Sequence, residues 1–385
     1  MNKSLSFDGK FDIVLTCASG LEKVVKSELK RLLNVEAPAI NGGVTFSGSA
    51  SDVAKCNVNL RAVDRVYIKI SQFPVETFDE IFERVKDVPW ENIFPPNAKI
   101  IVNGKCVKSK IFAVSATQSI IKKAIVVRLL EKYRISSLNE TGALYEVDFD
   151  IFKDECTLKL NTSGVGLHKR GYRDLVGIAP IKETLASGLV LLSDYYYKNP
   201  FIDPFCGSGT IAIETAKIAL NIGGGVLRKF AFNDWDNFDK NYYKRAIEEA
   251  RDNEKRDIKP EIIGYDIDKK AIELSKYHAK KAGLERIVKF CVGDVKDLKS
   301  NLSNGTIVTN PPYGERVYDI REAEACYKNL GHAYKRLDNW SLFAITSAPS
   351  FEKHFGIKAD RSRKLYNSNR ECRFYYYYKN KGENK

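Results

Sequence analysis

Two short segments contain the residue types that a group-transfer reaction needs. The first is DPFCGSGT (Asp203 to Thr210), and the second, about a hundred residues later, is TNPPYGER (Thr309 to Arg316). The first combines an acid with closely spaced glycines, and the second combines an amide, two prolines and an aromatic ring. Together they favour a nucleotide-like cofactor beside a planar substrate that carries an amine. The chemistry that fits is methylation of a base or amide nitrogen with S-adenosylmethionine.

The glycine-rich segment has the pattern of a strand that ends in a tight turn and opens a helix. Gly207 and Gly209 can adopt positive φ and let the backbone approach a ligand, and a helix that begins at Thr210 offers its amides to a carboxylate. Asp203 can pair with an ammonium group. A ligand with both amino and carboxylate groups, as methionine has, therefore fits better than a pyrophosphate. The predicted cofactor residues here are Asp203, Phe205, Cys206, Gly207, Ser208, Gly209 and Thr210.

Two acids compete for the ribose hydroxyls of such a cofactor. A dinucleotide-type site places an acid about 20 residues beyond the glycines, and Asp234 is nearer to that spacing. Asp266, however, directly follows the apolar run IIGY, so we favour it, together with Ile267, and Asp234 stays open as the alternative. Asp294 and Val295, after the next apolar run, are predicted to lie at the adenine ring.

The segment NPPY supplies hydrogen-bond acceptors in a rigid frame. The exocyclic amine of guanine or adenine is a poor nucleophile because its lone pair is delocalised into the ring. The side-chain oxygen of Asn310, which also lies beside the predicted cofactor, and the carbonyl of Pro311 can accept both N–H bonds, while Pro311 and Pro312 fix the backbone. Tyr313 can stack on the flat substrate. In-line positioning then supplies most of the rate, on the order of several kcal/mol, and no acid–base pair is required.

A formal net charge of +13 suits a polyanionic partner, because basic side chains release the counterions of phosphates. Residues 92–130 hold seven basic residues and no acid, and LHKRGYR (167–173) gathers basic and aromatic residues before the C-terminal part. A solvated helix face and a solvated linker are the respective alternatives. The residues predicted to contact RNA are Lys108, Lys110, Lys122, Lys123, Arg128, His168, Lys169, Arg170, Tyr172, Arg173 and Arg316.

Length and composition set the wider frame. A chain of 385 residues predicts two or three domains. The sequence has no apolar run long enough to cross a membrane and no secretory signal core, so we expect a cytoplasmic protein. The eight cysteines form no CxxC pair and the four histidines are isolated. We therefore expect free thiols, with neither a metal site nor a disulfide framework.

The hydrophobic patterns of the first 162 residues predict two small α/β units. Residues 1–65 have strands over 11–17 and 43–48 and helices over 20–33 and 51–60, the second capped by Ser51, which is a ferredoxin-like pattern. A further strand over 65–73 completes this first pattern. Residues 66–162, with a second small α/β unit from about Val75 to Leu160, are predicted to contain helices over 78–88 and 115–133, a strand over 99–107 and a hairpin over 143–164.

After a linker over 163–181, residues 182–380 alternate between strand and helix patterns, which predicts a parallel, doubly wound sheet. Residues 221–260 are predicted as a helical insertion, and Asp268 as the cap of the helix after IIGYDI. The runs 361–368 and 370–379 are predicted as an antiparallel hairpin, with Tyr375 to Tyr378 mostly buried. That ending is typical of the class I methyltransferase sheet and not of a dinucleotide-binding sheet.

DPFCGSGT, GYDID, GD and TNPPYGER, preceded by LHKRGYR and APIKETLA, resemble the THUMP-domain RNA guanine-N2 methyltransferases, in particular the RlmL/YpsC-like bacterial family. The likeness covers nearly the whole chain. Residues 1–65 resemble the ferredoxin-like domain of that family and 66–162 its THUMP RNA-binding domain. NPPY alone is shared with adenine-N6 and glutamine-N5 methyltransferases, but NPPYGER with LHKRGYR and APIKETL is far more specific. One departure is Asn367-Ser368, where the family often has Asn-Gly.

The resemblance implies a class I, Rossmann-like methyltransferase domain over 182–380 that uses S-adenosylmethionine. It implies transfer to the 2-amino group of a guanosine in RNA, with 23S ribosomal RNA favoured and tRNA as the nearest variant. In the family pattern Asp203, Gly207 and Gly209 line the methionine end of the cofactor, Asp266 the ribose and Asp294 the adenine, and residues 310–313 hold the guanine. Two other interpretations stay open: an adenine-N6 nucleic-acid methyltransferase acting on DNA, and a non-catalytic RNA-binding assembly factor.

Overall fold

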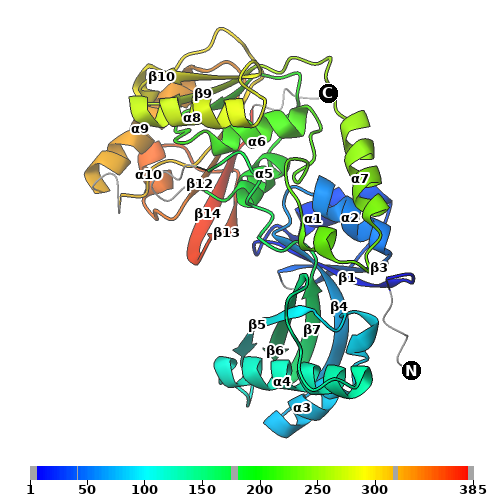
Figure 1. Ribbon diagram of the computed structural model, residues 1–385. Coiled ribbons are helices and arrows are strands. Elements are labelled where there is room, and N and C mark those ends of the chain that lie inside the picture. Colours follow the sequence, from blue (N-terminus) through cyan, green and yellow to red (C-terminus); the bar gives the residue numbers. More distant parts are fainter. Residues whose placement is uncertain (1–6, 41, 175–180, 315–319, 380–385) are drawn as a thin grey trace.

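The chain folds around two seven-stranded sheets, one N-terminal and one C-terminal (Figure 1). The computed structural model describes residues 7–40, 42–174, 181–314 and 320–379. The N-terminal elements are β1 (Phe11–Thr16), α1 (Glu22–Leu33), β2 (Ala39–Ile40), β3 (Gly43–Gly48), α2 (Ala50–Asn59), β4 (Arg65–Pro74), α3 (Phe78–Lys86), η1 (Trp90–Asn92), β5 (Lys99–Val107), α4 (Val114–Tyr133), β6 (Leu144–Phe152) and β7 (Glu155–Asn161).

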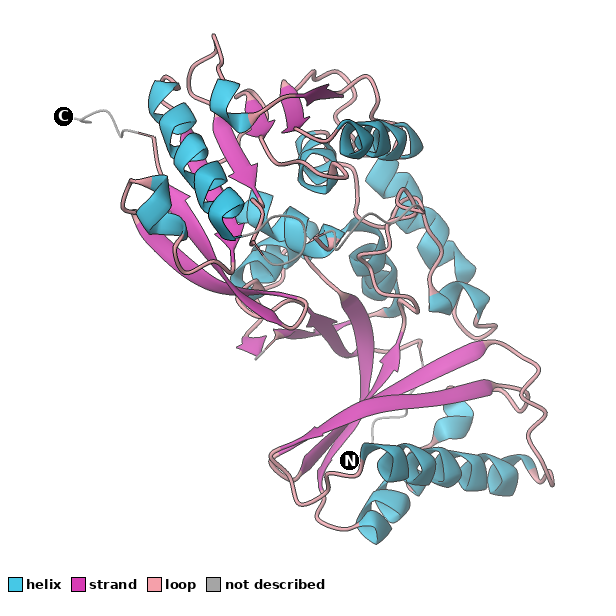
Figure 2. Ribbon diagram, turned by 90° about the vertical axis from the view of Figure 1, so that its left-hand side faces the viewer, coloured by secondary structure: helices cyan, strands magenta, loops and turns pink. Residues whose placement is uncertain are grey.

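The N-terminal sheet is continuous across the two small units that the sequence predicts. Its order is β2-β3-β1-β4-β7-β6-β5. The first residues of β4 pair with β1, and almost the whole of β4 pairs with β7 on its other side. In Figure 2 the long strands of this sheet lie above the helices at the base of the molecule. The strand β4 therefore joins the ferredoxin-like unit and the following unit into one body.

Helix α2 begins earlier than predicted. Ser49, not Ser51, is its N-cap: the Ser49 hydroxyl accepts from the backbone N–H of Asp52, and the Asp52 carboxylate accepts from the N–H of Ser49 at 2.8 Å. The prediction of Ser51 was wrong because this reciprocal capping box requires an acid three residues after the cap. Ser51 instead lies in the first turn of the helix.

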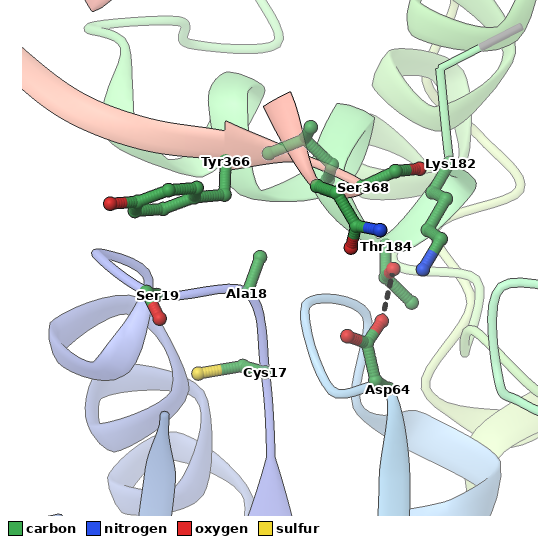
Figure 3. Close-up of a pocket in the computed structure, with 10 residues that line it drawn as sticks. Cys17, Ala18, Ser19, Asp64, Lys182, Thr184, Tyr366 and Ser368 are labelled. Atoms are coloured by element: carbon green, nitrogen blue, oxygen red, sulfur yellow. Dashed lines mark hydrogen bonds between the residues drawn. The ribbon is translucent and has the colours of Figure 1, made fainter. Parts of the chain in front are cut away.

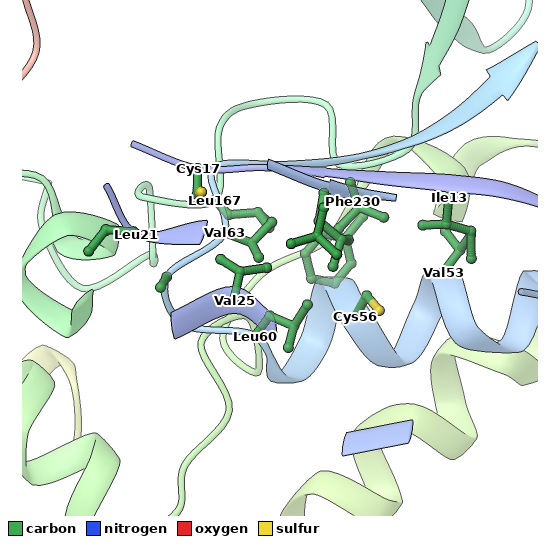
Figure 4. Close-up of a cluster of buried hydrophobic side chains, with 14 of the residues drawn as sticks. Ile13, Cys17, Leu21, Val25, Val53, Cys56, Leu60, Val63, Leu167 and Phe230 are labelled. Atoms are coloured by element: carbon green, nitrogen blue, oxygen red, sulfur yellow. The ribbon is translucent and has the colours of Figure 1, made fainter. Parts of the chain in front are cut away.

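The core beneath β1 and β4 draws on distant parts of the chain (Figure 4). Ile13 of β1, Val25 of α1 and Val53 of α2 are fully buried there, as expected for the apolar faces of strand and helices. Leu167, from the segment after β7, and Phe230, from the segment after α6, belong to the same core. The C-terminal part of the chain therefore completes the core of the N-terminal part.

The C-terminal sheet has the order β10-β9-β8-β11-β12-β14-β13. Strands β8 to β12 are parallel, whereas β14 is antiparallel to both of its neighbours. This confirms the predicted doubly wound sheet with a final antiparallel hairpin, in which Tyr375, Tyr376 and Tyr377 are buried. Its elements are α5 (Glu183–Leu192), β8 (Phe201–Asp203), α6 (Thr210–Ala219), η2 (Ala231–Asp234), α7 (Lys240–Asp252), β9 (Ile262–Asp266), α8 (Lys269–Lys281), β10 (Val288–Val292), η3 (Val295–Asp297), β11 (Thr306–Thr309), α9 (Ile320–Arg336), β12 (Ser341–Thr346), α10 (Phe351–Phe355), β13 (Arg361–Asn367) and β14 (Arg370–Tyr377).

The insertion between α6 and β9 fastens the two halves together. Trp235 stacks on Tyr145 of β6 with ring centroids 4.9 Å apart, and its indole N–H donates to the carbonyl of Leu144 at 2.9 Å. The side chain of Asn237 donates to the carbonyl of Ile93 at 2.7 Å. The insertion therefore holds the C-terminal part against the N-terminal sheet.

The hairpin β13–β14 makes a second contact between the halves. The Arg363 guanidinium donates to the carbonyl of Gly20, in the loop after β1, at 3.0 Å. In the turn of this hairpin Ser368 has φ of 56°, a left-handed conformation that costs a non-glycine residue roughly 1–2 kcal/mol. Ser368 is the residue at which the sequence departs from the family pattern that it resembles.

Within the described ranges, no helix has both the length and the apolar character to cross a membrane. The eight cysteines are free, and five of them are buried.

Candidate active site

Four of the predicted polar residues lie at one edge of the C-terminal sheet. Asp203 ends β8, Asp266 ends β9, Asp294 follows β10 and Asn310 follows β11. These four strands are adjacent and parallel. The strand order reverses between β8 and β11, and ligands of open α/β sheets bind at such a point, beyond the carboxyl ends of the strands.

The glycine turn is held against the end of β9. The N–H of Gly207 donates to Oδ2 of Asp266 at 2.9 Å, and the N–H of Cys206 donates to the carbonyl of Tyr265 at 2.8 Å. Gly207 and Gly209 have φ of 51° and 83°. A Cβ on Gly209 would lie 2.7 Å from the Phe290 ring, whereas one on Gly207 would meet nothing within 4 Å. Gly209 therefore serves packing, and Gly207 borders open space that a ligand can occupy.

Asp203 has one carboxylate oxygen without a partner. Its side chain is buried, and Oδ1 accepts from the Thr309 hydroxyl at 2.7 Å and from the N–H of Phe205 at 3.3 Å. Oδ2 is also buried and makes no hydrogen bond within the described part of the chain. Burial raises the pKa of Asp203 to about 7. A buried polar atom normally has a partner, so this oxygen fits the ammonium group of a ligand.

Asp266 braces the turn and borders an exposed apolar side chain. Its Oδ1 accepts from the N–H of Asp268 at 3.0 Å, and burial raises its pKa. Ile267 leaves 58% of its surface exposed, which offers an apolar contact to a planar ring beside the acid. Asp268 caps α8 as predicted. The alternative acid, Asp234, lies in η2, which packs against β6 of the N-terminal sheet.

Asp294 has a polar side chain that caps a helix, whereas the side chain of Val295 is buried. The Asp294 carboxylate caps η3 through the N–H of Lys296 at 3.0 Å and pairs with the ammonium of Lys296 at 3.2 Å. Val295 is only 5% exposed and belongs to the core cluster around α9. Its predicted place against an adenine ring is corrected by this burial, because the side chain packs into the core.

The segment after β11 orients its own acceptors. The Tyr313 hydroxyl donates to Oδ1 of Asn310 at 2.6 Å, and the Tyr327 hydroxyl donates to the carbonyl of Pro312 at 2.5 Å. The carbonyl of Pro311 receives no hydrogen bond from any described residue. The Arg370 guanidinium lies 5.7 Å from the centroid of the Tyr313 ring. Asn310 keeps a second lone pair on Oδ1, so two acceptors remain available here.

Sequence reasoning missed three residues that support this site: Thr309, Tyr327 and Arg370. Thr309 connects β11 to Asp203 across the point where the strand order reverses. Tyr327 lies on α9, 15 residues after Pro312, and Arg370 lies on β14, about 60 residues after the motif. Of these three residues, only Thr309 could have been found from the sequence, because it directly precedes Asn310 in the motif.

The segment LHKRGYR is mostly interior, which corrects its predicted RNA role. Arg170 and Tyr172 are fully buried, and both contact the carboxylate of Glu214, at 3.8 and 2.9 Å. Arg173 pairs with Glu183 at 3.1 Å, with only 9% of its side chain exposed. The prediction that Arg170, Tyr172 and Arg173 contact RNA was wrong, because these side chains tie the linker to α5 and α6.

His168 and Lys169, in the same segment, differ in charge and exposure. Burial, with the nearby charge of Lys182 as the second cause, lowers the pKa of His168 to about 4. His168 is therefore neutral at pH 7 and supplies no charge to a phosphate. Lys169 is exposed. Arg316 lies outside the described residues.

The other predicted RNA-binding residues lie at the far end of the N-terminal sheet. Lys108 and Lys123 are exposed. Lys110 pairs with Glu76 at 2.5 Å, Lys122 with Glu140 at 2.8 Å and Arg128 with Glu91 at 2.6 Å. In these three pairs a carboxylate already accompanies the cation, so their contribution to phosphate binding is reduced. Among the described residues no group of three or more His, Cys, Asp or Glu side chains is arranged to hold a metal ion.

Three domain families match consecutive parts of the chain. Residues 12–67 match the RlmL ferredoxin-like domain, residues 75–161 the THUMP domain, and residues 170–375 the family described as RMKL-like, methyltransferase domain. The last match alone spans more than half of the chain.

Two curated relatives show the range of lengths. "Putative RNA methyltransferase YpsC" of Bacillus subtilis is 42% identical over 96% of this chain and 96% of its own. "Ribosomal RNA large subunit methyltransferase K/L" of Syntrophotalea carbinolica is 31% identical over 95% of this chain and 53% of its own. The chain therefore spans about half the length of that second relative.

Solved structures share the whole fold. A protein of Listeria monocytogenes, described as a predicted N6-adenine-specific DNA methylase, is 45% identical, with a TM-score of 0.92 over 97% of each chain. SMU.472, described as "a putative methyltransferase complexed with SAH", is 38% identical, with a TM-score of 0.92 over 97% of this chain and 100% of its own.

Proposed function

Because the chain belongs to the RMKL-like methyltransferase family, with RlmL ferredoxin-like and THUMP domains before the methyltransferase domain, we propose that it is an S-adenosylmethionine-dependent RNA methyltransferase. The proposed acceptor is the exocyclic 2-amino group of a guanosine. The observation that carries the proposal is the meeting of Asp203 and Asn310 through Thr309. This contact between β8 and β11 supports an arrangement in which Asp203 binds the ammonium group of the ligand and Asn310 binds the amine of the substrate.

The residues present fit S-adenosylmethionine. The unpartnered oxygen of Asp203 suits the ammonium of its methionine part, and the open space at Gly207 admits the chain. Asp266 is proposed for the ribose hydroxyls, with Ile267 against the adenine and Asp294 at its amine. The relative SMU.472, complexed with SAH, supports this choice.

When bound, the cofactor supplies an electrophilic methyl group. This chain holds the acceptor nitrogen in line with that methyl group. Oδ1 of Asn310 and the carbonyl of Pro311 accept hydrogen bonds from the two N–H groups of the amine and leave its lone pair exposed. Tyr313 and Tyr327 restrain the two ends of the segment. After transfer the acceptor nitrogen loses one proton, which solvent water can take, in keeping with a step that requires no acid–base pair. Positioning accounts for most of the rate.

Several observations support RNA as the substrate class. Residues 75–161 match the THUMP domain, and two relatives are named as methyltransferases of RNA and of large-subunit ribosomal RNA. The net charge of +13 suits a polyanion. We propose 23S ribosomal RNA as the first substrate to test, with tRNA as the second.

The name of the Listeria relative favours one rival, an adenine-N6 methyltransferase acting on DNA. The deciding experiment incubates the protein with methyl-labelled cofactor and, separately, unmodified 23S RNA transcripts, tRNA and duplex DNA. Nucleosides are then separated after digestion. Label in N2-methylguanosine is the expected result, and label only in N6-methyladenine would replace our proposal by the rival. Tight RNA binding without any product would favour a non-catalytic factor.

A further inference from the structure

A cavity of about 460 Å³ lies between the loop after β1 and the tip of the β13–β14 hairpin (Figure 3). We call it the junction cavity. Its size falls within the range of about 300–1,000 Å³ that is usual for small-ligand sites. The lining residues that matter below are Cys17, Ser19, Asp64, Lys182, Tyr366 and Ser368. Both halves of the molecule therefore contribute to it.

The hairpin tip presents different side chains to its two sides. In the register of the hairpin Tyr366 lies opposite Glu371, and Asn367 lies opposite Arg370. Because side chains alternate along a strand, Tyr366 and Arg370 point to opposite faces. Arg370 lies over the Tyr313 ring, and Cys372, two residues on, is 3.9 Å from the Tyr313 hydroxyl. One face of the tip therefore borders the proposed active site, while the other borders the junction cavity.

The cavity combines a ring, a cation and a carboxylate. In Figure 3 the Tyr366 ring from the hairpin lies across the gap from Ser19 of the β1 loop. Asp64 accepts from the Thr184 hydroxyl through Oδ1 at 2.6 Å, and its Oδ2 has no hydrogen bond to another described residue. Lys182 forms no ion pair with any residue in the described ranges. A carboxylate accepts from the N–H groups of a base edge, a lysine binds phosphate, and an aromatic ring stacks on a base.

The cavity adjoins a second hollow. A groove of about 910 Å³ over the open face of the N-terminal sheet shares Cys17 and Ser19 with the junction cavity. The side chains that line this groove include both cations and carboxylates: Arg65, Tyr67, Lys69, Lys159, Glu146, Asp148 and Asp150. A chain-like ligand can therefore pass from the sheet into the cavity. In addition, Ser368 keeps its side chain at the cavity although its φ of 56° is unfavourable for serine.

From these observations we infer that the junction cavity is a subsite for an unpaired base of the RNA that neighbours the target nucleotide. The base stacks on Tyr366 and donates from its edge to Asp64, and Lys182 binds the adjoining phosphate. The hairpin tip then lies between this base and the target base. The inference rests on the proposed RNA methyltransferase function and adds the ferredoxin-like domain to the substrate site.

The test uses the full chain and an unmodified 23S RNA transcript as the probe. We expect Tyr366→Ala to raise the KM for RNA about tenfold, since stacking on one base has an effect of this order, while the Kd for SAH is unchanged. Tyr366→Phe keeps the ring and should behave like the wild type. Lys182→Ala should weaken RNA binding and lower its salt dependence by about one counterion. Tyr196→Ala removes a tyrosine that is more exposed than Tyr366 and lies outside the cavity, before β8, and it serves as the control.

The outcomes separate this inference from the proposed function. If the wild type methylates guanosine in RNA but Tyr366→Ala and Lys182→Ala bind RNA as tightly as Tyr196→Ala does, the subsite is refuted and the function stands. If the wild type methylates only DNA adenine, the function itself fails. A second measurement needs no variant. Ultraviolet crosslinking of the wild type to the transcript should label peptides that contain Ser19 or Tyr366, and crosslinks found only elsewhere would overturn the subsite.

Discussion

The hydroxyl of Tyr313 donates a hydrogen bond to Oδ1 of Asn310 over 2.6 Å. This contact restrains the rotation of the carboxamide whose oxygen we propose to hold the substrate amine. The Tyr313 ring is itself restrained, because its hydroxyl also lies 3.9 Å from the sulfur of Cys372. Strand β14, which carries Cys372, therefore helps to fix the orientation of the acceptor Asn310, which follows β11.

Tyr313→Phe should lower the rate of methyl transfer about two- to tenfold, because one hydrogen bond contributes about 0.5–1.5 kcal/mol. The ring stays, so RNA affinity and SAH affinity should change little. Single-turnover transfer to a saturating 23S transcript measures the effect. An unchanged rate would show that Asn310 does not depend on this contact.

Asn310→Ala should reduce transfer at least about 100-fold, the usual loss when a preorganised polar contact to the reacting group is removed. Calorimetry with SAH should give a nearly unchanged Kd. Asn241→Ala, an exposed asparagine on α7, is the matched control. Near-normal turnover of Asn310→Ala would contradict the proposed exposure of the lone pair.

The affinity for SAH should depend on pH through Asp203. Burial raises the pKa of this carboxyl to about 7, so it is largely protonated in the ligand-free protein below that pH. An ammonium group binds the ionised form, so binding releases a proton below about pH 7. The Kd should therefore fall about tenfold per unit as pH rises from 5 towards 7, and level off above 7.

Asp203→Asn should bind SAH weakly and without this pH dependence, and calorimetry in buffers of different ionisation enthalpy should show no proton release. The same shift has a consequence for folding. A carboxyl whose pKa is raised in the folded state binds its proton there more tightly, so its contribution to stability decreases as pH rises from about 4 to about 7. In the ligand-free protein Asp203→Asn should remove that decrease.

Asp266→Ala should raise the Kd for SAH about tenfold or more, because it removes both the proposed ribose acceptor and the hydrogen bond to Gly207. Asp234→Ala should leave the Kd unchanged, since Asp234 is exposed on η2. Calorimetry on the two variants side by side decides between the two acids. The reverse ranking would move the ribose role to Asp234.

Glu214→Gln should destabilise the fold by about 3–5 kcal/mol, the usual effect of removing one partner from a buried charged group. Arg170 and Lys217, both buried, would lose their anion. Glu36→Ala, in the exposed pair with Lys30, should leave the denaturation midpoint unchanged. Chemical denaturation measures both. If Glu214→Gln changed the denaturation midpoint as little as Glu36→Ala does, Glu214 would not be needed to stabilise the buried cations.

The sequence predicted the features that depend on local patterns. The glycine turn, the strand before Asp266 and the final hairpin follow from glycine spacing, apolar runs and β-branched or aromatic residues, and the comparisons confirm both the fold class and the family resemblance. Asp203 and Asn310 could be placed at one edge because the carboxyl ends of parallel strands meet there.

What the sequence did not predict depends on tertiary contacts. Arg170 and Tyr172 have the composition of a nucleic-acid contact, but their partner Glu214 lies on another element and draws them inside. Val295 follows a strand end like its neighbours, yet the packing of α9 buries it. The restraint of Pro312 by Tyr327 spans a loop and a helix, so no local pattern records it.

The strand β4 belongs to both N-terminal units at once. The two units therefore share a strand, and the insertion through Trp235 ties the methyltransferase domain to the same sheet. These contacts set the distance from the far end of the THUMP domain to Asn310. If the chain acts on RNA as we propose, an RNA in contact with the THUMP domain can present to Asn310 only a nucleotide that lies at a matching distance.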